Sequence, residues 1–236
     1  MAYVMTLRAW CAPGAPRPQP QDLIVQACNP DFLDGRVTTH PIGGAAYVHD
    51  GSDEWNGPAA PLFYGGVREP AHTKPLMVAY RAENDRGRRR DAAVNRDKVA
   101  ETLAKAGHPN TFYQYASEYF KDLPAYRFVA SPEGSSEDAH RHYETLLAGC
   151  VPIIERNPFI EAKYAGLPLL LTTDYSEITD EYLNAKWDEM LDQTFDFSKM
   201  FVSTYSPEVQ AKIKEGGNFW CKNIFNSNPA RWVYYT

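Results

Sequence analysis

The stretch that decides the fold covers residues 126–154 and reads YRFVASPEGSSEDAHRHYETLLAGCVPII. It opens with the apolar run YRFVAS, continues through a loop of small polar residues and a helical pattern over residues 138–148, and ends in the apolar run VPII. The apolar residues of the helical part recur at i, i+4, i+7 and i+8 and form one face: Ala139, Tyr143, Leu146 and Leu147. This order predicts two parallel strands joined by a helix that packs on the sheet.

The same alternation extends to both sides of this stretch. Strands are predicted at residues 74–80 (KPLMVAY) and 167–172 (LPLLLT), helices at residues 92–106 and 179–191, and one or two further helices past residue 206. We therefore expect an α/β fold with a Rossmann-like parallel sheet and helices on both of its faces.

The first third of the chain has more loops and turn residues. Two short strands are predicted there, at residues 22–27 and 37–41, separated by Gly-, Pro- and Asp-rich connections. We expect a boundary near residue 72, with a reduced N-terminal region over residues 1–72 and the Rossmann-like domain over residues 73–236.

Composition limits the classes of function. The 236 residues have a formal net charge of -6, which argues against a general nucleic-acid binder, because phosphate affinity comes from positive faces. No apolar run approaches the roughly 20 residues that span a bilayer, and the N-terminus does not have the pattern of a signal peptide. The four cysteines are far apart without CxxC spacing, which favours reduced thiols and a cytoplasmic protein.

Polar residues follow the strand YRFVAS at the point where open α/β sheets bind ligands, beyond the carboxyl ends of the strands. Gly134 and Ser135 allow an anion to approach the backbone closely, and Ser135 with Asp138 resembles a helix-capping arrangement. The start of a helix also attracts anions through its unpaired N–H groups. The pattern predicts a site for a small anionic ligand.

The first turns of the helix add a cation, a carboxylate and an imidazole. His140 and Glu144 lie four residues apart, and Arg141 follows His140 directly. Arginine suits a phosphate and glutamate suits two hydroxyl groups, but the same residues also fit a solvated helix face with an ordinary ion pair. His140 and Glu144 have the spacing of metal ligands too, although no third ligand can be identified, and we expect no metal.

Here the sequence resembles a known family. The string FVASPEGSSEDAHRHYETLLAGCVPII is similar to the signature of exostosin-like glycosyltransferases, including small viral and algal members: a strand, PRG, a Gly-rich loop, D-x-HR, W-E-A-L, GC and a PI strand. THPIGG at residues 39–44, VNRDKV at residues 94–99 and LPLLLTTDYSEIT at residues 167–179 resemble further family segments in the same order.

The resemblance implies a GT-B-type enzyme that holds a nucleotide-sugar donor, with UDP favoured, and transfers its sugar to a glycan acceptor with inversion. It implies no metal or other cofactor beside the nucleotide-sugar. It assigns the diphosphate to Gly134, Ser135 and the start of the helix, with Arg141 and Arg96 as cations, and Ser131 to the nucleotide-sugar site. His140 belongs to the same helix start, and Glu144 is assigned to the ribose hydroxyls.

Two departures from the family pattern change the expectation. Glu133 stands where the family has arginine, which predicts weaker binding of the donor or a different donor, and Y-E-T-L replaces W-E-A-L. The N-terminal region is also short for an acceptor domain, so a partner subunit, including a second copy of the chain, is an alternative source of the acceptor side. A GDP-fucose-dependent enzyme and a non-catalytic sugar-binding module remain open as alternatives.

Four further elements of the prediction lie outside the signature. Arg81 follows the strand KPLMVAY and Asp174 follows LPLLLT, so both are expected to contact the donor, although Asp174 equally fits a helix cap. The run DRGRRRD at residues 85–91 fits a solvated loop or a loop that closes over a diphosphate. The catalytic base is predicted to be Asp50 or His49, within reach of the acceptor hydroxyl.

Overall fold

A computed structural model of the chain describes residues 3–12, 14–16, 24, 41–44, 72–113 and 116–224, with side chains described up to residue 216. Its centre is a four-stranded parallel sheet in the order β2-β3-β4-β5. The strands are β2 (Lys74–Val78), β3 (Tyr126–Ala130), β4 (Val151–Glu155) and β5 (Leu170–Thr172). Helices flank this sheet, so the predicted α/β class with a parallel sheet is confirmed, and the arrangement is consistent with a Rossmann-like fold.

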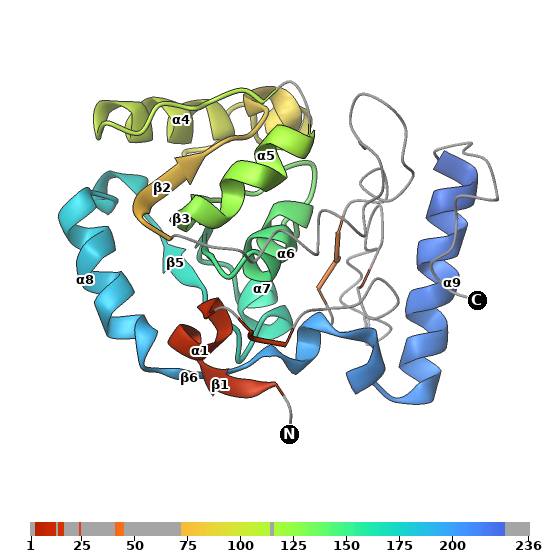
Figure 1. Cartoon of the computed structure of the whole chain (residues 1–236). Coiled ribbons are helices and arrows are strands. Elements are labelled where there is room, and N and C mark those ends of the chain that lie inside the picture. Colours follow the sequence, from red (N-terminus) through yellow and green to blue (C-terminus); the bar gives the residue numbers. More distant parts are fainter. Residues whose placement is uncertain are drawn as a thin grey trace.

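Helices cover both sides of the sheet and one of its ends. Figure 1 shows α8 on one side, α5 and α6 on the other, and α4 across the end toward which the β2 arrow points. The helices of this part are α4 (Arg96–Lys105), α5 (Ala116–Asp122), α6 (His140–Leu147), α7 (Pro158–Lys163) and α8 (Asp180–Leu191). Short 3-10 helices link them: η3 (Ala82–Asp85), η4 (Leu123–Ala125), η5 (Tyr175–Glu177), η6 (Phe197–Met200) and η7 (Val202–Thr204).

The strand register brings the carboxyl ends of the strands to one edge. Val78 of β2 pairs with Ala130 of β3, which pairs with Ile153 of β4, which pairs with Leu170 of β5. We call this end of the sheet, with the segments that directly follow the strands, the carboxyl edge. Among the described strands the spatial order follows the chain order, so this sheet lacks the reversal of strand order where doubly wound sheets usually bind ligands.

The predicted apolar face of α6 is buried, and the polar residues His142, Glu144 and Thr145 of the helix are buried as well. Tyr143, Leu146 and Leu147 are at most 1 % exposed, as expected for the side that meets the sheet. The predicted cap is wrong, because the side chain of Ser135 does not cap α6. The helix starts at His140 after Ala139, whose side chain has no polar atom to accept an N–H. By contrast, Asn95 caps α4 and Thr179 caps α8 through side-chain oxygens.

The N-terminal residues belong to the same hydrophobic core. β1 (Val4–Thr6) pairs antiparallel with β6 (Thr194–Asp196), and α1 (Leu7–Cys11) follows directly. Trp10 is 1 % exposed, donates from Nε1 to the carbonyl of Leu146 at 3.0 Å and stacks on Phe197 with 4.0 Å between ring centres. The strands expected at residues 22–27 and 37–41 lie outside the described residues apart from residues 24 and 41, and the boundary near residue 72 stays a prediction.

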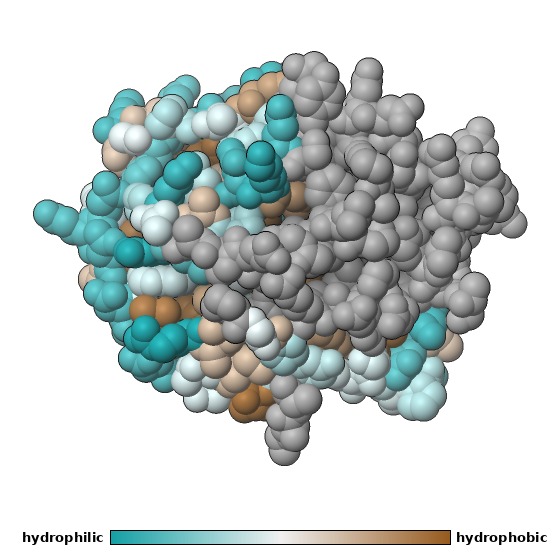
Figure 2. Space-filling model, in the orientation of Figure 1, coloured by the Kyte–Doolittle hydropathy of each residue, from teal (hydrophilic) through white to brown (hydrophobic). Residues whose placement is uncertain are grey.

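Past residue 206, the described residues form one helix, α9 (Pro207–Ile224). Cys11 and Cys150 are free thiols, as predicted for them. No helix in the described part of the chain is long and apolar enough to span a membrane. Figure 2 shows a mostly hydrophilic surface over α4 and α8, because their apolar side chains, such as Leu103 and Trp187, face inward.

Candidate functional site at the carboxyl edge

The loop after β3 is held in place by a buried serine and histidine. The hydroxyl of Ser131 lies 2.6 Å from Nδ1 of His142, and Nε2 of His142 lies 3.3 Å from the carbonyl of Glu137. Because a carbonyl only accepts, Nε2 carries the proton, and Nδ1 accepts the hydroxyl of Ser131. Both side chains are fully buried, and burial lowers the pKa of His142 to about 4. The hydrogen bond of Ser131 therefore connects the start of the loop to α6.

Arg96 lies in the centre of the carboxyl edge. Its guanidinium donates to three backbone carbonyls, from Nε to Glu133 at 2.8 Å, from Nη2 to Pro132 at 3.0 Å and from Nη1 to Arg81 at 3.1 Å. It also lies 5.4 Å from the ring centre of Tyr80. Burial, followed by the charge of Arg141, lowers the pKa of Arg96 to about 10, so it stays charged at neutral pH.

Arg141 differs from Arg96 in its partners. Its guanidinium lies 4.9 Å from the ring centre of Tyr119, and it forms no ion pair with the described residues. Its Nη1 is buried and has no hydrogen-bond partner within the described segments. A buried N–H of a charged group without an acceptor is costly, so this atom indicates a place for an anion or a water molecule.

Glycine is required next to Arg96. A Cβ added to Gly134 would lie 2.8 Å from Nη2 of Arg96, so a side chain at residue 134 would displace the guanidinium. The N–H of Gly134 donates to the carbonyl of Ser136 at 3.0 Å, and the hydroxyl of Ser135 donates to the carbonyl of Asn84 at 3.0 Å. The N–H of Gly134 and the hydroxyl of Ser135 thus stabilise the conformation of the loop through contacts within the protein.

The other predicted residues of α6 are Glu144 and His140. Glu144 is 4 % exposed and lies one turn after Arg141. His140 is half-buried, with Nδ1 3.0 Å from the carbonyl of Gly43, which ties the helix start to the short described piece of the N-terminal region.

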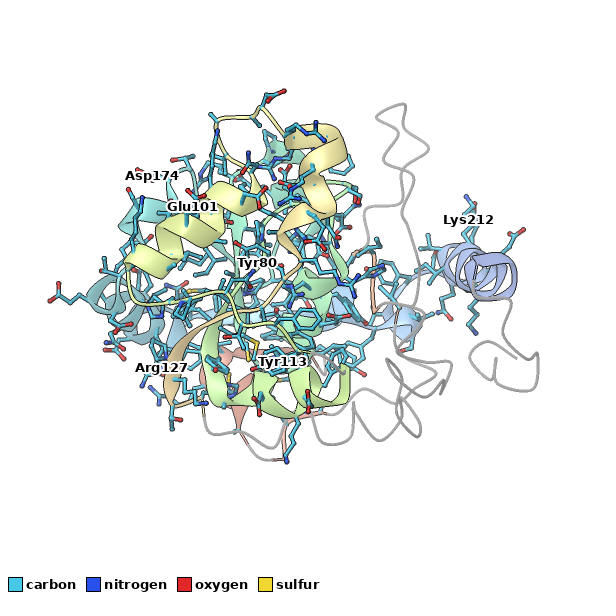
Figure 3. All side chains as sticks on the ribbon, turned by 90° about the horizontal axis from the view of Figure 1, so that it is seen from above. Tyr80, Glu101, Tyr113, Arg127, Asp174 and Lys212 are labelled. Atoms are coloured by element: carbon cyan, nitrogen blue, oxygen red, sulfur yellow. The ribbon has the colours of Figure 1, made fainter. Side chains whose placement is uncertain are left out.

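Arg81 and Asp174 occupy the periphery. Arg81 is exposed, and its contribution to the centre of the edge is the carbonyl that accepts from Arg96. Asp174 is exposed and caps η5, and the hydrogen bond from the N–H of Ser176 holds its pKa below the usual value. Figure 3, viewed from the α4 end, shows Tyr80 near the centre of the molecule and Asp174 at its rim. The predicted bases His49 and Asp50 lie outside the described residues.

Sequence reasoning missed the partners of Glu133. Its carboxylate lies 2.6 Å from Nη2 of Arg88 and 3.4 Å from Nη1 of Arg89, and it accepts from Asn157 at 3.2 Å. Nη2 of Arg89 reaches the carboxylate of Glu155 at 3.1 Å. Both arginines come from α3 (Arg86–Arg89), inside the run DRGRRRD. The interpretation of this run as a solvated loop is thus wrong for Arg89, whose side chain is 11 % exposed, whereas Arg88 remains exposed although it pairs with Glu133.

The described residues contain no group of three or more His, Cys, Asp or Glu that could hold a metal ion. In the comparisons with known proteins, no family model and no curated protein matches the chain.

Proposed function

We propose that the carboxyl edge binds the diphosphate of a nucleotide-sugar, UDP-linked by preference, and that the protein is a glycosyltransferase of the exostosin-like type. The observation that carries the proposal is the buried Nη1 of Arg141, which has no hydrogen-bond partner in the described part of the chain. The order of the motifs that resemble the exostosin-like signature supports a nucleotide-sugar as the class of ligand.

The electrostatics of the two central arginines support an anionic ligand. Arg96 and Arg141 are close enough for the charge of Arg141 to lower the pKa of Arg96. Two like charges in a partly buried place repel each other, and an anion between them removes this cost. A phosphate group offers several acceptor oxygens for the planar guanidinium groups, and the start of α6 adds its partial positive charge.

The proposed roles follow from this arrangement. Arg141 and Arg96 stabilise the negative charge that develops on the leaving nucleoside diphosphate, a task that arginine performs without a metal. Glu144, one turn along α6, accepts hydrogen bonds from the ribose hydroxyls. An acceptor hydroxyl displaces the diphosphate at the anomeric carbon with inversion, and His49 or Asp50 takes its proton.

Calorimetric titration of UDP, GDP and their sugars, GDP-fucose included, tests the proposal. For the preferred nucleotide, Arg141→Gln is expected to weaken binding about tenfold or more, because a hydrogen bond to a charged group is worth about 1.5–3 kcal/mol. The matched control is Arg127→Gln, since Arg127 also lies over an aromatic ring, that of Trp187 at 5.9 Å, but at the amino end of β3.

The outcomes separate the candidate functions. Preference for GDP-fucose would replace the UDP assignment with a fucosyltransferase-like one. Binding of a nucleotide-sugar without release of nucleotide to any acceptor would indicate a binding module. If no nucleotide binds, or if Arg141→Gln binds as the wild type does, the proposal is wrong.

A further inference from the structure

Five charged side chains form a chain of ion pairs in and beside the loop that follows β3. Glu155 pairs with Arg89 at 3.1 Å, Arg89 with Glu133 at 3.4 Å, and Glu133 with Arg88 at 2.6 Å. Arg88 pairs further with Glu137 at 3.0 Å. The carboxylates of Glu133 and Glu155 are only 10 % and 11 % exposed.

Both carboxylates lie close to the proposed anion site. Glu133 directly precedes Gly134, and its N–H donates to Glu155 at 2.9 Å. The carbonyl of Glu133 accepts from Arg96, so its backbone contacts a central cation of the site. Weakly solvated charges interact strongly at such distances, and without cations nearby these carboxylates would repel a diphosphate.

We propose that Arg88 and Arg89 neutralise Glu133 and Glu155, so that the carboxyl edge admits an anionic ligand although residue 133 is acidic. This inference rests on the proposed function. The two arginines are thus positioning residues that set the local charge, and they act on the ligand through Glu133 and Glu155.

The hydrogen bonds of Arg88 fit neutralisation better than direct contact with a phosphate. Its Nη1 donates to Glu137, and its Nη2 donates to Glu133 and to the carbonyl of Gly134 at 3.3 Å. Its Nε lies 3.4 Å from the same carbonyl. Every nitrogen of the Arg88 guanidinium therefore has an acceptor within the protein, whereas the buried Nη1 of Arg141 has none among the residues that the structure describes.

A double-mutant cycle on the full chain tests this inference. The ligands are the preferred nucleoside diphosphate and, separately, pyrophosphate, and the readout is the dissociation constant by calorimetry. Arg88→Gln is expected to weaken binding about tenfold, because Glu133 loses its nearest cation. The double variant Arg88→Gln/Glu133→Gln is expected to return to within about threefold of the wild type, because the charge that repels the ligand is gone.

Two control variants separate neutralisation from other effects. Arg86→Gln removes the same charge from α3, but Arg86 pairs with the exposed Asp97 at 3.0 Å, so binding should stay within about threefold. Arg88→Lys keeps the charge and should also bind as the wild type does. If Arg88→Gln does not fold, Glu133→Gln alone serves the test, and it should bind at least as tightly as the wild type.

Each result has a defined reading. Unchanged binding by Arg88→Gln, or a double variant that stays as weak as Arg88→Gln, would overturn the inference and leave the proposed function intact. If the wild type binds pyrophosphate but no nucleotide, the proposed function fails while the cycle with pyrophosphate still decides the inference. If the wild type binds neither ligand, both are wrong.

Discussion

Glu133 illustrates how a single residue depends on partners that are distant in the sequence. A carboxylate that is almost buried is costly unless cations and hydrogen-bond donors surround it. Arg88 and Arg89, 45 and 44 residues earlier, supply the cations, and Asn157 donates to the second carboxylate oxygen. The acidic residue at this position is thus compatible with the packing around it.

Replacement of this residue by arginine, which stands at this place in the exostosin-like signature that the sequence resembles, is expected to destabilise the protein. Glu133→Arg would place a third guanidinium against Arg88 and Arg89, and a broken buried ion pair costs about 3–5 kcal/mol. Urea unfolding followed by circular dichroism measures the loss. The control is Glu137→Arg in the same loop, because the side chain of Glu137 is 33 % exposed and should cost much less. Equal stability of Glu133→Arg and the wild type would contradict the role assigned to the ion pairs.

At the scale of elements, one hydrogen bond couples the loop after β3 to the body of α6. Ser131 directly follows β3, His142 lies in the first turn of α6, and their side chains lie 2.6 Å apart and are fully buried. In the neutral ring, Nδ1 accepts from the Ser131 hydroxyl. Burial disfavours the charged ring, so protonation of His142 opposes the packing of this connection and makes its stability depend on pH.

Stability should fall as the pH decreases from about 6.5 to about 4. The pKa of His142 is lowered from 6.5 to about 4 by burial, so in this window the unfolded chain binds a proton that the folded protein does not. The loss attributable to His142 is about 3 kcal/mol, fully developed below pH 4. Urea unfolding at stepped pH values measures it. His142→Gln should be less stable at pH 7.5, and its free energy of unfolding should fall less steeply between pH 6.5 and 4. If the free energy of unfolding of the variant falls as steeply as that of the wild type, the assignment to His142 is wrong.

At the scale of the whole molecule, the amino-terminal strand pairs with a strand from late in the chain. β1 pairs with β6, which lies almost 200 residues later, and Leu7 and Trp10 of α1 are buried in the core of the α/β part. A unit that shares its core with another is expected to unfold together with it.

Trp10→Ala should therefore lower the stability of the α/β part by about 3–5 kcal/mol, in a single transition, as expected for a large aromatic side chain removed from a core. Differential scanning calorimetry with near-UV circular dichroism measures both features. Arg8→Ala is the control in the same helix, because Arg8 pairs with Asp192 on the exposed surface, and it should change little. Two separate transitions, or a stable α/β part in Trp10→Ala, would show that the N-terminal residues fold independently.

The sequence by itself determined the four strands of the parallel sheet and the helices α4, α6 and α8. β2, β3 and β4 start at the first residue of the predicted runs, and α8 lies within one residue of its predicted range, because apolar spacing and capping residues are local properties. β5 is shorter than predicted, and α5 and α7 were not predicted. In these segments the apolar spacing is weak, and turn-forming residues nearby favour a loop.

Only the tertiary structure decided the order of the strands, the pairing of β1 with β6 and the neighbours of the charged residues. Sequence spacing brought Arg141 and Glu144 to one helix, but it did not indicate that Arg96 would bind three carbonyls or that Arg88 would reach Glu133. The physical reason is that the partner of a charge is chosen by distance through space and by burial, and both exist only after the elements have packed.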